Sequence, residues 1–341
     1  MDIQGFCDSG HADCDIGHAM TKKNIVSGIL DAAVVPGFSR IGYDIRSRLL
    51  KWEKVSHLRL DGRVIVITGP TSGLGLATAN ILASTGAHLV LVARNNEKCQ
   101  QVATELRTRH PQLDVDVVIA DMGDLSSVAH ASNEICNKFP RVDVLVHNAG
   151  ALLQERQESP QGIELTVASH VLGPFLMTTM LRDVLRAANG RVVTVSSGGM
   201  YAANLPTVQD EKCPEVRPYN GSRQYALAKR MQVTLNEMWA REEPAIEFVA
   251  MHPGWADTPG VQESIPGFRK VTRPILRSAE QGADTIAWLS AVTPLPSQSG
   301  TFWCDRETRS IHKTPSTKKS DTPSSRDALW KWCASVVGPF A

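Results

Sequence analysis

The sequence predicts an α/β fold, in which helices cover both faces of a doubly wound, parallel β-sheet. Short apolar runs rich in β-branched residues alternate with longer helical patterns through the middle of the chain. This alternation is typical of parallel strands joined by helical crossovers. Polar and glycine-rich segments follow directly after several of the apolar runs. Because ligands of such sheets bind outside the carboxyl ends of the strands, these segments form the candidate site.

Seven apolar runs account for the strands, and the helical patterns between them account for the helices. The first run, Val64–Ile67, has four consecutive β-branched residues, which favours a buried strand. In chain order, the strands are expected at 63–69, 88–93, 115–120, 142–147, 190–196, 245–251 and 300–304. The helices are expected near 73–85, 96–109, 124–138, 160–187, 223–242 and 278–291. Right-handed crossovers between these elements give the doubly wound order.

The chain is expected to hold one α/β domain with an extension at each end. Residues 61–305 supply the ~250 residues that one α/β unit of this kind needs. Residues 1–23 are expected to form a disordered leader, and 24–60 a helical extension. Residues 306–341 are expected to form a flexible tail, because Ser, Thr, Lys and Pro dominate it before a short apolar helix.

The N-terminal extension has an amphipathic helical pattern over 41–60. Ile45, Leu49 and Trp52 share one face, while basic residues lie elsewhere. Two interpretations stay open for this helix. Either it packs on the α/β domain or a second subunit, or its apolar face makes peripheral contact with an anionic membrane surface.

Composition and charge argue against several classes of protein. A formal net charge of +1 argues against nucleic acid as a partner, because phosphate binding needs a basic excess. No run reaches the ~18 apolar residues of a transmembrane span, and the polar N-terminus does not resemble a signal peptide. The odd number of Cys, seven, favours reduced thiols in a cytoplasmic protein. Cys7, His11, Cys14 and His18 have no familiar zinc spacing, so no metal is expected.

A glycine-rich segment follows the first strand and leads into a helix. It reads Thr68-Gly69-Pro70-Thr71-Ser72-Gly73-Leu74-Gly75. Glycines at such a junction let backbone N–H groups approach a pyrophosphate, and the positive end of the helix favours its charge. The spacing differs from the G-x-G-x-x-G pattern of many dinucleotide sites, but the strand–loop–helix context predicts a phosphate-binding loop.

Two further landmarks carry groups suited to proton transfer. Tyr225 and Lys229 are four residues apart in a helical pattern, so their side chains share one face. A phenol with a pKa near ~10 is a poor acid–base group at neutral pH, and a nearby ammonium lowers that pKa. Ser196 and Ser197 end the strand expected at 190–196, where a hydroxyl can hold a substrate oxygen.

These landmarks, together with the Asn-Ala-Gly segment 148–150, resemble in kind and order the short-chain dehydrogenase/reductase superfamily. The resemblance covers roughly 62–305. It implies a Rossmann fold, an NAD(P) cofactor and hydride transfer between a carbonyl and an alcohol. It also implies catalytic roles for three residues. Tyr225 is the proton donor, Ser197 holds the substrate oxygen, and Lys229 lowers the pKa of the phenol and binds the nicotinamide ribose.

The resemblance also implies the cofactor contacts along the carboxyl edge of the sheet. The expected cofactor-binding residues are Thr68, Gly69, Thr71, Ser72, Gly73, Leu74, Gly75, Arg94, Asp121, Asn148, Ala149, Gly150, Tyr225, Lys229, Pro253, Gly254 and Thr258. Arg94 follows the second strand, where NAD-selective relatives carry an acidic residue. Its guanidinium suits a 2′-phosphate, so NADP (NADPH) is the expected cofactor and NAD the alternative. Stacking of Arg94 on the adenine is the other interpretation.

One position departs from the family pattern. The slot on the helix expected at 160–187 that usually holds a catalytic Asn holds His170, and no Asn occurs between 151 and 188. Family members use mainly the backbone carbonyl of this residue, which holds a relay water. His170 is therefore a candidate catalytic residue, either through its carbonyl or through an imidazole with a pKa near ~6.5. A buried imidazole without a catalytic role is the third interpretation.

The predicted function is that of an NADP-dependent oxidoreductase acting on a carbonyl or alcohol of an apolar small molecule. Trp255 and Trp303 motivate the apolar substrate, because small-molecule pockets are lined mostly by apolar side chains. The alternative is a catalytically weak nucleotide-binding regulatory protein of the same fold. Family members often pair through helices near 124–187 and 223–242, so a homodimer or homotetramer is expected. The segment 251–261 is similar to the member-twelve type of the superfamily.

Overall fold

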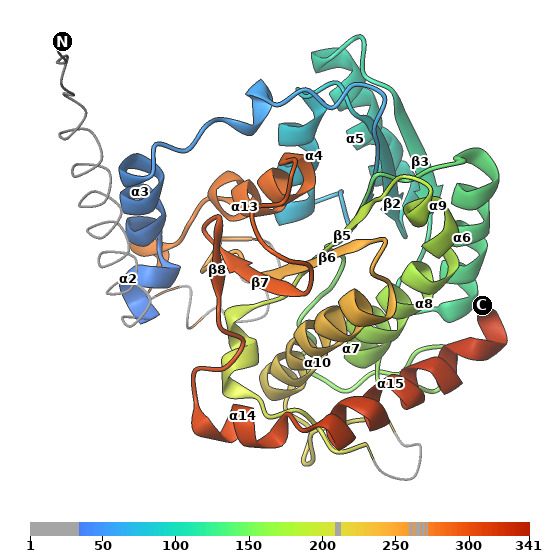
Figure 1. Ribbon diagram of the computed structural model, residues 1–341, viewed down its shortest axis with the longest axis vertical. Helices are drawn as coiled ribbons and strands as arrows, with labels where there is room; N and C mark the ends of the chain where they lie inside the picture. The colour runs from blue at the N-terminus through green and yellow to red at the C-terminus, as the bar shows by residue number, and fades with distance from the viewer. Residues whose placement is uncertain (1–33, 209–212, 259–261, 263–266, 268–269, 271) are drawn as a thin grey trace, which may run out of the picture.

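One β-sheet runs through the centre of the protein. The computed structural model describes residues 34–208, 213–258 and 272–341, together with 262, 267 and 270, so the expected leader at 1–23 with its Cys and His residues lies outside it. The described part forms an eight-stranded sheet of order β3-β2-β1-β4-β5-β6-β7-β8 (Figure 1). The first seven strands run parallel, and β8 is antiparallel to β7. The predicted doubly wound α/β fold is confirmed.

All seven predicted strands are present, most of them with slightly shorter bounds. They are β1 (Val64–Thr68), β2 (His88–Ala93), β3 (Val115–Ile119), β4 (Val144–His147), β5 (Arg191–Val195), β6 (Glu247–Met251) and β7 (Thr301–Cys304). The further strand β8 (Glu307–Arg309) was not expected, because three residues carry too little of a pattern. The central strands are buried almost throughout, as strands covered on both faces are.

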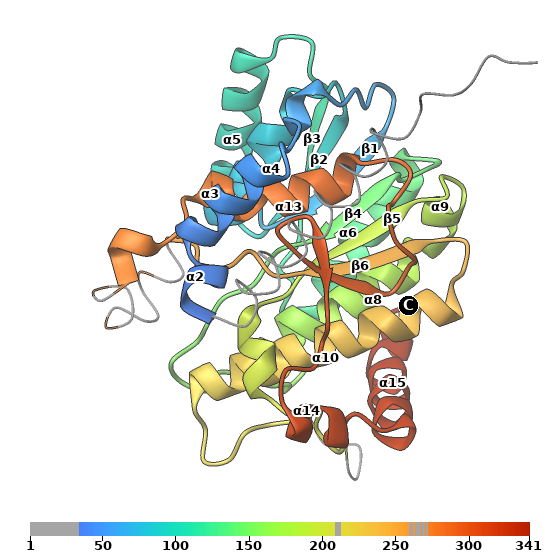
Figure 2. The ribbon, with the colours of Figure 1, turned by 60° about the vertical axis from the view of Figure 1, so that its left-hand side comes forward.

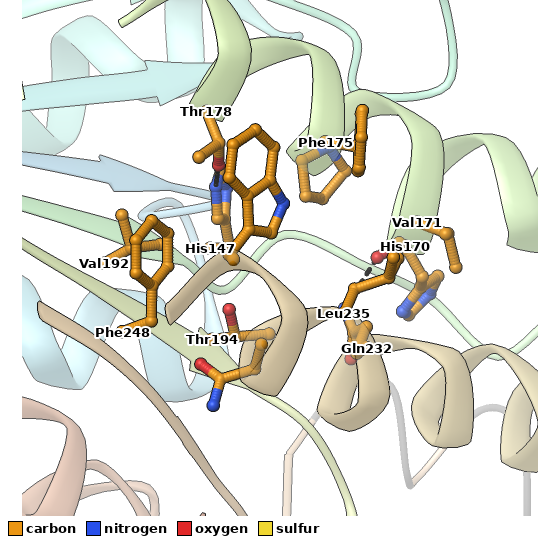
Figure 3. Close-up of a pocket in the computed structure, with 13 residues that line it drawn as sticks. His147, His170, Val171, Phe175, Thr178, Val192, Thr194, Gln232, Leu235 and Phe248 are labelled. Atoms are coloured by element: carbon orange, nitrogen blue, oxygen red, sulfur yellow. Dashed lines mark hydrogen bonds between the residues drawn. The ribbon is translucent and has the colours of Figure 1, made fainter. Parts of the chain in front are cut away.

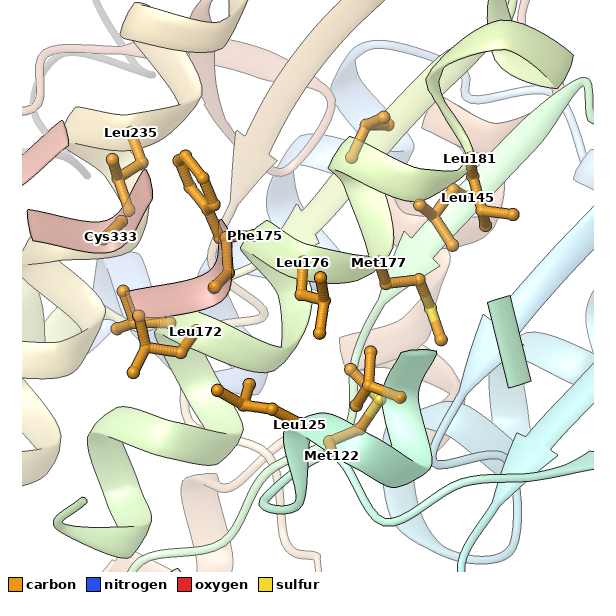
Figure 4. Packing of buried hydrophobic residues seen from close by; sticks show 14 of the residues in the cluster. Met122, Leu125, Leu145, Leu172, Phe175, Leu176, Met177, Leu181, Leu235 and Cys333 are labelled. Carbon is orange, nitrogen blue, oxygen red and sulfur yellow. The ribbon is translucent and has the colours of Figure 1, made fainter. Parts of the chain in front are cut away.

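Helices form one layer on each face of the sheet (Figure 2). One layer contains α4 (Gly73–Ala83), α5 (Asn96–Arg109) and α13 (Ala279–Ala291). The other contains α6 (Leu125–Lys138), α8 (Gly173–Met180) and α10 (Gly221–Glu242). In the second layer Leu125, Leu176 and Met177 pack toward Leu145 of β4 (Figure 4).

The helix expected at 160–187 is shorter and broken. Gly162, with φ of 71°, makes a turn, and the Glu164 carboxylate caps the first helical residues by accepting two backbone N–H groups. The elements that follow are α7 (Leu165–Val167), a five-residue π-helical turn η2 (Ala168–Leu172), α8 and α9 (Arg182–Arg186). The turn η2 carries His170.

The tail at 306–341 is folded, which corrects the expectation of a flexible segment. After β8 come α14 (Pro315–Ser320), α15 (Pro323–Val337) and the single turn η5 (Gly338–Phe340). The buried side chains of α15, which join the core beneath α8 and α10, are Leu329, Trp332, Cys333 and Val337. Trp330 lies 4.8 Å from Trp239 of α10 and 5.0 Å from Phe175 of α8, centroid to centroid. The helix α15 therefore covers the face through which pairing of subunits was predicted.

The N-terminal extension contains α2 (Val34–Phe38), α3 (Arg40–Leu49) and the turn η1 (Val55–His57). The helix expected over 41–60 thus ends at Leu49, because Lys51 adopts a left-handed φ of 49°. Helix α3 packs on the catalytic domain through its buried Arg46. Within the described part of the chain, no helix combines the length and apolarity that crossing a bilayer requires.

Candidate active site

The loops that follow β1 and β4 are joined to each other at the carboxyl edge of the sheet. The Thr68 hydroxyl accepts the backbone N–H groups of Asn148 and Ala149, both at 3.0 Å. In return, the Asn148 amide donates to the carbonyls of Thr68 and Gly69, at 3.0 and 3.1 Å. These residues were predicted to contact the cofactor, and the structure shows that they also hold the two loops together.

The glycines of the glycine-rich loop let it pack closely on the Asn-Ala-Gly segment and on the start of α4. Gly69 has a φ of 67°, and a Cβ there would lie 2.9 Å from the Cα of Ala149. A Cβ on Gly75 would lie 2.1 Å from the Gly69 carbonyl oxygen. Ser72 precedes α4 but its side chain does not cap the helix, so the first N–H groups of α4 remain suited to an anion. The other predicted residues of this loop and turn are Thr71, Gly73 and Leu74.

Arg94 and Asp121 lie further along the same edge. Arg94 is exposed directly after β2. Asp121 follows β3, where its carboxylate accepts the Gly123 N–H at 2.9 Å and its own N–H donates to the Ser127 hydroxyl. The Asp121 turn is thus held by local hydrogen bonds, whereas the guanidinium of Arg94 is open to an anion from solvent.

Ser197, Tyr225 and Lys229 meet where β5 ends beside α10. Asn220 starts α10 by accepting the N–H of Arg223. The phenol of Tyr225 lies close enough to Ser197 for the serine to lower its pKa, and the Ser197 hydroxyl accepts the Gly199 N–H at 3.2 Å. The Nζ of Lys229 lies 5.3 Å from the centroid of the Tyr225 ring. The structure thus brings together the three residues predicted to carry the chemistry.

The pKa values of Tyr225 and Lys229 differ from what the sequence suggests. Burial raises the pKa of Tyr225, and the neighbouring Ser197 opposes this only in part. Burial also lowers the pKa of Lys229 to about 7. The Lys229 ammonium donates to the carbonyl of Val195 at 2.8 Å rather than to the phenol. Burial is therefore the main cause of both pKa shifts, and the charge of Lys229 is not among the causes that act on Tyr225.

Ser196, the residue before Ser197, makes hydrogen bonds that hold the fold together. The Ser196 hydroxyl donates to the backbone carbonyl of Lys229 at 3.0 Å, and the Ser196 N–H donates to the carbonyl of Met251. Ser196 therefore ties β5 to both α10 and β6. This leaves Ser197 as the serine whose hydroxyl faces Tyr225.

His170 lies beside Tyr225 and Lys229, and its imidazole is neutral. Burial, followed by the charge of Lys229, lowers the pKa of His170 to about 3. Its ring meets that of Tyr225 edge-on at 5.4 Å between centroids, and its Nε2 lies 2.9 Å from the carbonyl oxygen of Ala151. A Cβ on Gly150 would lie 2.2 Å from this ring. An ionisation of His170 near ~6.5 is thus not supported.

The backbone carbonyl of His170 has a partner that the sequence analysis missed. Gln232 donates to it through Nε2 at 2.7 Å. Both residues line a cavity of about 30 Å³ beneath the site (Figure 3), whose other lining residues are His147, Val171, Pro174, Phe175, Thr178, Val192, Thr194, Leu235, Asn236, Trp239 and Phe248. This volume suits about two water molecules. Helical spacing could have identified Gln232, which follows Lys229 by three residues and Tyr225 by seven.

The loop after β6 is fixed by contacts from two distant segments. Gly254 has a φ of 72°, and a Cβ there would lie 2.5 Å from the guanidinium carbon of Arg277. Arg277 also donates to the carbonyl of Pro253 at 3.2 Å. The Trp255 N–H donates to the carbonyl of Phe38 at 2.7 Å, so α2 reaches the site. Thr258 ends this described stretch of the loop.

A buried ion-pair cluster holds the extension against this loop. Asp305 accepts from Arg46 at 2.6 Å and from Arg277 at 2.6 and 2.9 Å, and all three side chains are 1% exposed. Burial alone would raise the pKa of Asp305, but the two guanidinium groups hold it below its usual range. Trp303, which was expected to line the substrate pocket, is instead buried against Trp288 of α13.

The part of the chain that the structure describes has no group of three or more His, Cys, Asp or Glu residues placed to hold a metal ion. The groups gathered at the carboxyl edge are a hydroxyl, a phenol, an ammonium and a glycine-rich loop. Such a set can bind a dinucleotide and exchange a proton with an oxygen atom.

Known proteins share both the sequence and the fold. Residues 63–267 match the family described as short chain dehydrogenase. The chain is 36% identical to dehydrogenase/reductase SDR family member 12 from Homo sapiens over 274 residues, which are 80% of this chain and 85% of the relative. It is 28% identical to retinol dehydrogenase 13 from Homo sapiens, over 83% of this chain and 87% of that relative.

Solved structures agree with these relatives. A 3-ketoacyl-(acyl-carrier-protein) reductase from Brucella melitensis, complexed with NADH, is 26% identical with a TM-score of 0.56, over 71% of this chain and 96% of its own. An alcohol dehydrogenase from Thermococcus sibiricus, complexed with 5-hydroxy-NADP, is 24% identical with a TM-score of 0.55. That match covers 70% of this chain and 93% of the dehydrogenase, and it shows a shared fold.

Proposed function

The chain belongs to the short-chain dehydrogenase/reductase family and is an NAD(P)-dependent oxidoreductase of alcohol or carbonyl groups, and from that premise we propose that it uses NADP and acts on an apolar small molecule. One observation carries the catalytic assignment. Ser197, Tyr225 and Lys229 meet at the end of β5, at the same edge as the glycine-rich loop. Such a meeting of a proton donor and a cofactor loop is what carbonyl reduction needs.

The bound nicotinamide would supply or accept the hydride at this edge. Because the side chains of Ser197 and Tyr225 are neighbours, both hydroxyl groups can reach a single substrate oxygen. In reduction, the phenol of Tyr225 donates its proton to the oxygen that becomes the hydroxyl, and in oxidation the phenolate takes that proton back. With the cofactor bound, Lys229 would hold the ribose, and its charge would then stabilise the phenolate that forms.

The proposed preference for NADP rests on Arg94. Its exposed guanidinium follows β2 at the edge where the adenine ribose binds in doubly wound folds. A guanidinium forms charge-assisted, often bidentate hydrogen bonds with a phosphate, and the unphosphorylated ribose of NAD offers no such charge.

The proposed apolar substrate is supported by the surroundings of Ser197. The ring of Phe38 lies directly against Gly198, where an added Cβ would be 2.7 Å from it. Trp255 meets this ring edge-on at 6.1 Å between centroids. Small-molecule pockets are typically lined by apolar and aromatic side chains of this kind. Three further apolar residues that follow Trp255 in the sequence, Val261, Ile265 and Phe268, lie outside the described residues.

Replacement of Tyr225 by Phe tests the function. We expect a loss of at least ~10²-fold in NADPH oxidation, because a general acid typically contributes that much, while NADPH binding stays unchanged. The wild-type substrate would first be sought among sterol, retinoid, fatty-aldehyde and quinone carbonyls. Near-normal turnover in the Phe variant would contradict the assignment.

A nucleotide-binding regulatory protein is the second candidate function. It is favoured by the neutral imidazole of His170 at the slot where family members carry a catalytic Asn. NADPH binding without turnover of any carbonyl in the screen would establish this alternative.

The subunit arrangement and location of the protein belong to the same proposal. Pairing through α8 and α10 would require α15 to move, so a homodimer or homotetramer would use another surface. A cytoplasmic location rests on the odd number of seven Cys, since the five described ones are free thiols.

A further inference from the structure

Large apolar side chains are exposed in a stripe along the N-terminal extension. Val35 of α2 is 52% exposed, and Ile41, Ile45 and Leu49 of α3 are 47%, 40% and 37% exposed. The three residues of α3 are spaced by four, so they follow one face of the helix. Elsewhere in the described part of the chain, Ile119 of β3 is the one other large apolar residue with comparable exposure.

The opposite face of α3 fixes the direction of this stripe. Arg46 is buried in the ion-pair cluster with Asp305, and Asp44 accepts a hydrogen bond from Gln281 of α13 at 3.0 Å. Helix α3 lies at the edge of the described part of the molecule (Figure 1). The helix is thus held rigidly with its stripe of Ile41, Ile45 and Leu49 turned outward.

The stripe is bordered by positive charge. Arg40, Arg48, Lys51 and Lys54 are exposed within or just after α3, against one exposed carboxylate, that of Glu53, in the same segment. The nearby carboxylate of Asp44 is turned toward α13. An apolar stripe with a basic border is the pattern of helices that lie in the surface of an anionic bilayer.

We propose that α2 and α3 dock on an anionic lipid bilayer through this stripe and that the site receives its apolar substrate from that bilayer. A second copy of the chain fits less well, because a two-fold contact would bring the basic borders together. One ten-residue helix also offers little of the ~800 Å² per partner that stable interfaces bury. Anionic lipid satisfies both the apolar stripe and the cations.

The extension connects the bilayer to the site. Phe38 at the end of α2 lies against Gly198, which follows Ser197, and its carbonyl accepts the Trp255 N–H. Docking of α2 and α3 would therefore bind the lipid surface to the same segment whose Phe38 contacts the site. This delivery step rests on the proposed function, whereas docking itself does not.

Vesicle binding tests the docking. The full chain is sedimented with vesicles of phosphatidylcholine alone and of phosphatidylcholine with phosphatidylserine. We expect at least ~10-fold stronger partitioning onto the anionic vesicles. The triple variant Ile41→Ser, Ile45→Ser, Leu49→Ser should lose at least ~10-fold of that binding, because its apolar contact area is removed. The matched control is Ile119→Ser, which removes an equally exposed side chain and should bind normally.

A second variant separates charge from apolar contact. Arg48→Gln with Lys51→Gln should lose about 10-fold on anionic vesicles and little on neutral ones. The proposal is overturned if the wild type binds no vesicles, if the triple variant binds normally, or if Ile119→Ser loses as much. A dimer that dissociates in the triple variant, without vesicle binding, would assign the stripe to a second copy instead.

Turnover tests the delivery. With a water-soluble carbonyl in free solution, the triple variant should match the wild type, because none of its changes touches the site. With a long-chain carbonyl held in anionic vesicles, it should be at least ~10-fold slower. Equal rates on the vesicle-bound substrate would overturn delivery. If the wild type reduces neither substrate, the proposed function fails, while the sedimentation result still decides docking.

Discussion

Replacement of Lys229 by Met is expected to stabilise the cofactor-free protein at neutral pH while abolishing turnover. Lys229 is 3% exposed, and burial lowers its pKa from the ordinary 10.5 to about 7. Between these two values the unfolded chain binds a proton that the folded chain does not. The free energy of unfolding contributed by Lys229 therefore rises with pH across this window, and at neutral pH its burial is still a net cost.

The size of the effect follows from the two pKa values. Each unit by which a pKa shifts corresponds to ~1.4 kcal/mol. The shift of Lys229 from 10.5 to about 7 therefore means that its burial costs ~4 kcal/mol at neutral pH. Met keeps most of the stem packing but loses the hydrogen bond to the Val195 carbonyl, which is worth ~1 kcal/mol. We therefore expect the Met variant to gain ~2–3 kcal/mol in the free energy of unfolding.

Urea unfolding at several pH values measures this directly. The advantage of Lys229→Met should shrink as the pH rises from ~7 toward ~10, because the wild-type lysine is then neutral in both states. Lys319→Met, at an exposed position of α14, is the matched control and should change little. A Met variant that is less stable than the wild type at neutral pH, or an advantage independent of pH, would refute the reasoning.

Three further substitutions test the cofactor contact, the family departure and the ion-pair cluster. Arg94→Ala should weaken NADPH binding by ~10–100-fold and leave NADH nearly unchanged, and equal losses in the two titrations would contradict this. His170→Asn should keep turnover within a few-fold with an unaltered pH–rate profile, because burial keeps the pKa of His170 at about 3. A loss of ~10²-fold would instead make the imidazole catalytic. Asp305→Asn should lower the free energy of unfolding by ~3 kcal/mol or more, because Arg46 and Arg277 then stay buried without a carboxylate. The wild-type carboxylate stabilises the fold above its unfolded pKa of ~4 and loses this effect as pH falls, so a urea midpoint insensitive to the substitution would contradict its role.

Local sequence patterns were enough to predict the strands and the candidate catalytic residues. A run such as Val64–Ile67 is apolar and β-branched, so it predicts a buried strand without any knowledge of its neighbours. The spacing of Tyr225 and Lys229 likewise depends only on the helical repeat. These features could be predicted because the physical cause lies within a few residues of the chain.

Contacts between distant segments could not be predicted in this way. Arg46 and Asp305 are 259 positions apart, and nothing near either residue indicates an ion pair. The tail illustrates the same limit, because its Ser-, Thr- and Pro-rich start suggests disorder while Trp332 is buried under α8 and α10. The pKa of Lys229 also depends on burial, which emerges only when α10 packs on β5.

The sheet itself explains why a lysine is tolerated at such a buried position. The pairing of β4 with β5 ends at His147 and Thr194, so the carbonyl of Val195 lies beyond that ladder. Lys229 donates to this carbonyl, while Ser196 turns back to the carbonyl of Lys229. The divergence of two parallel strands thus creates an acceptor for an ammonium where a cofactor can also reach it. An acceptor of this kind reduces the cost of burying Lys229 but does not remove it, so the pKa of Lys229 remains at about 7. At neutral pH the side chain is therefore close to half protonated. A bound anionic cofactor then shifts it readily toward the charged form.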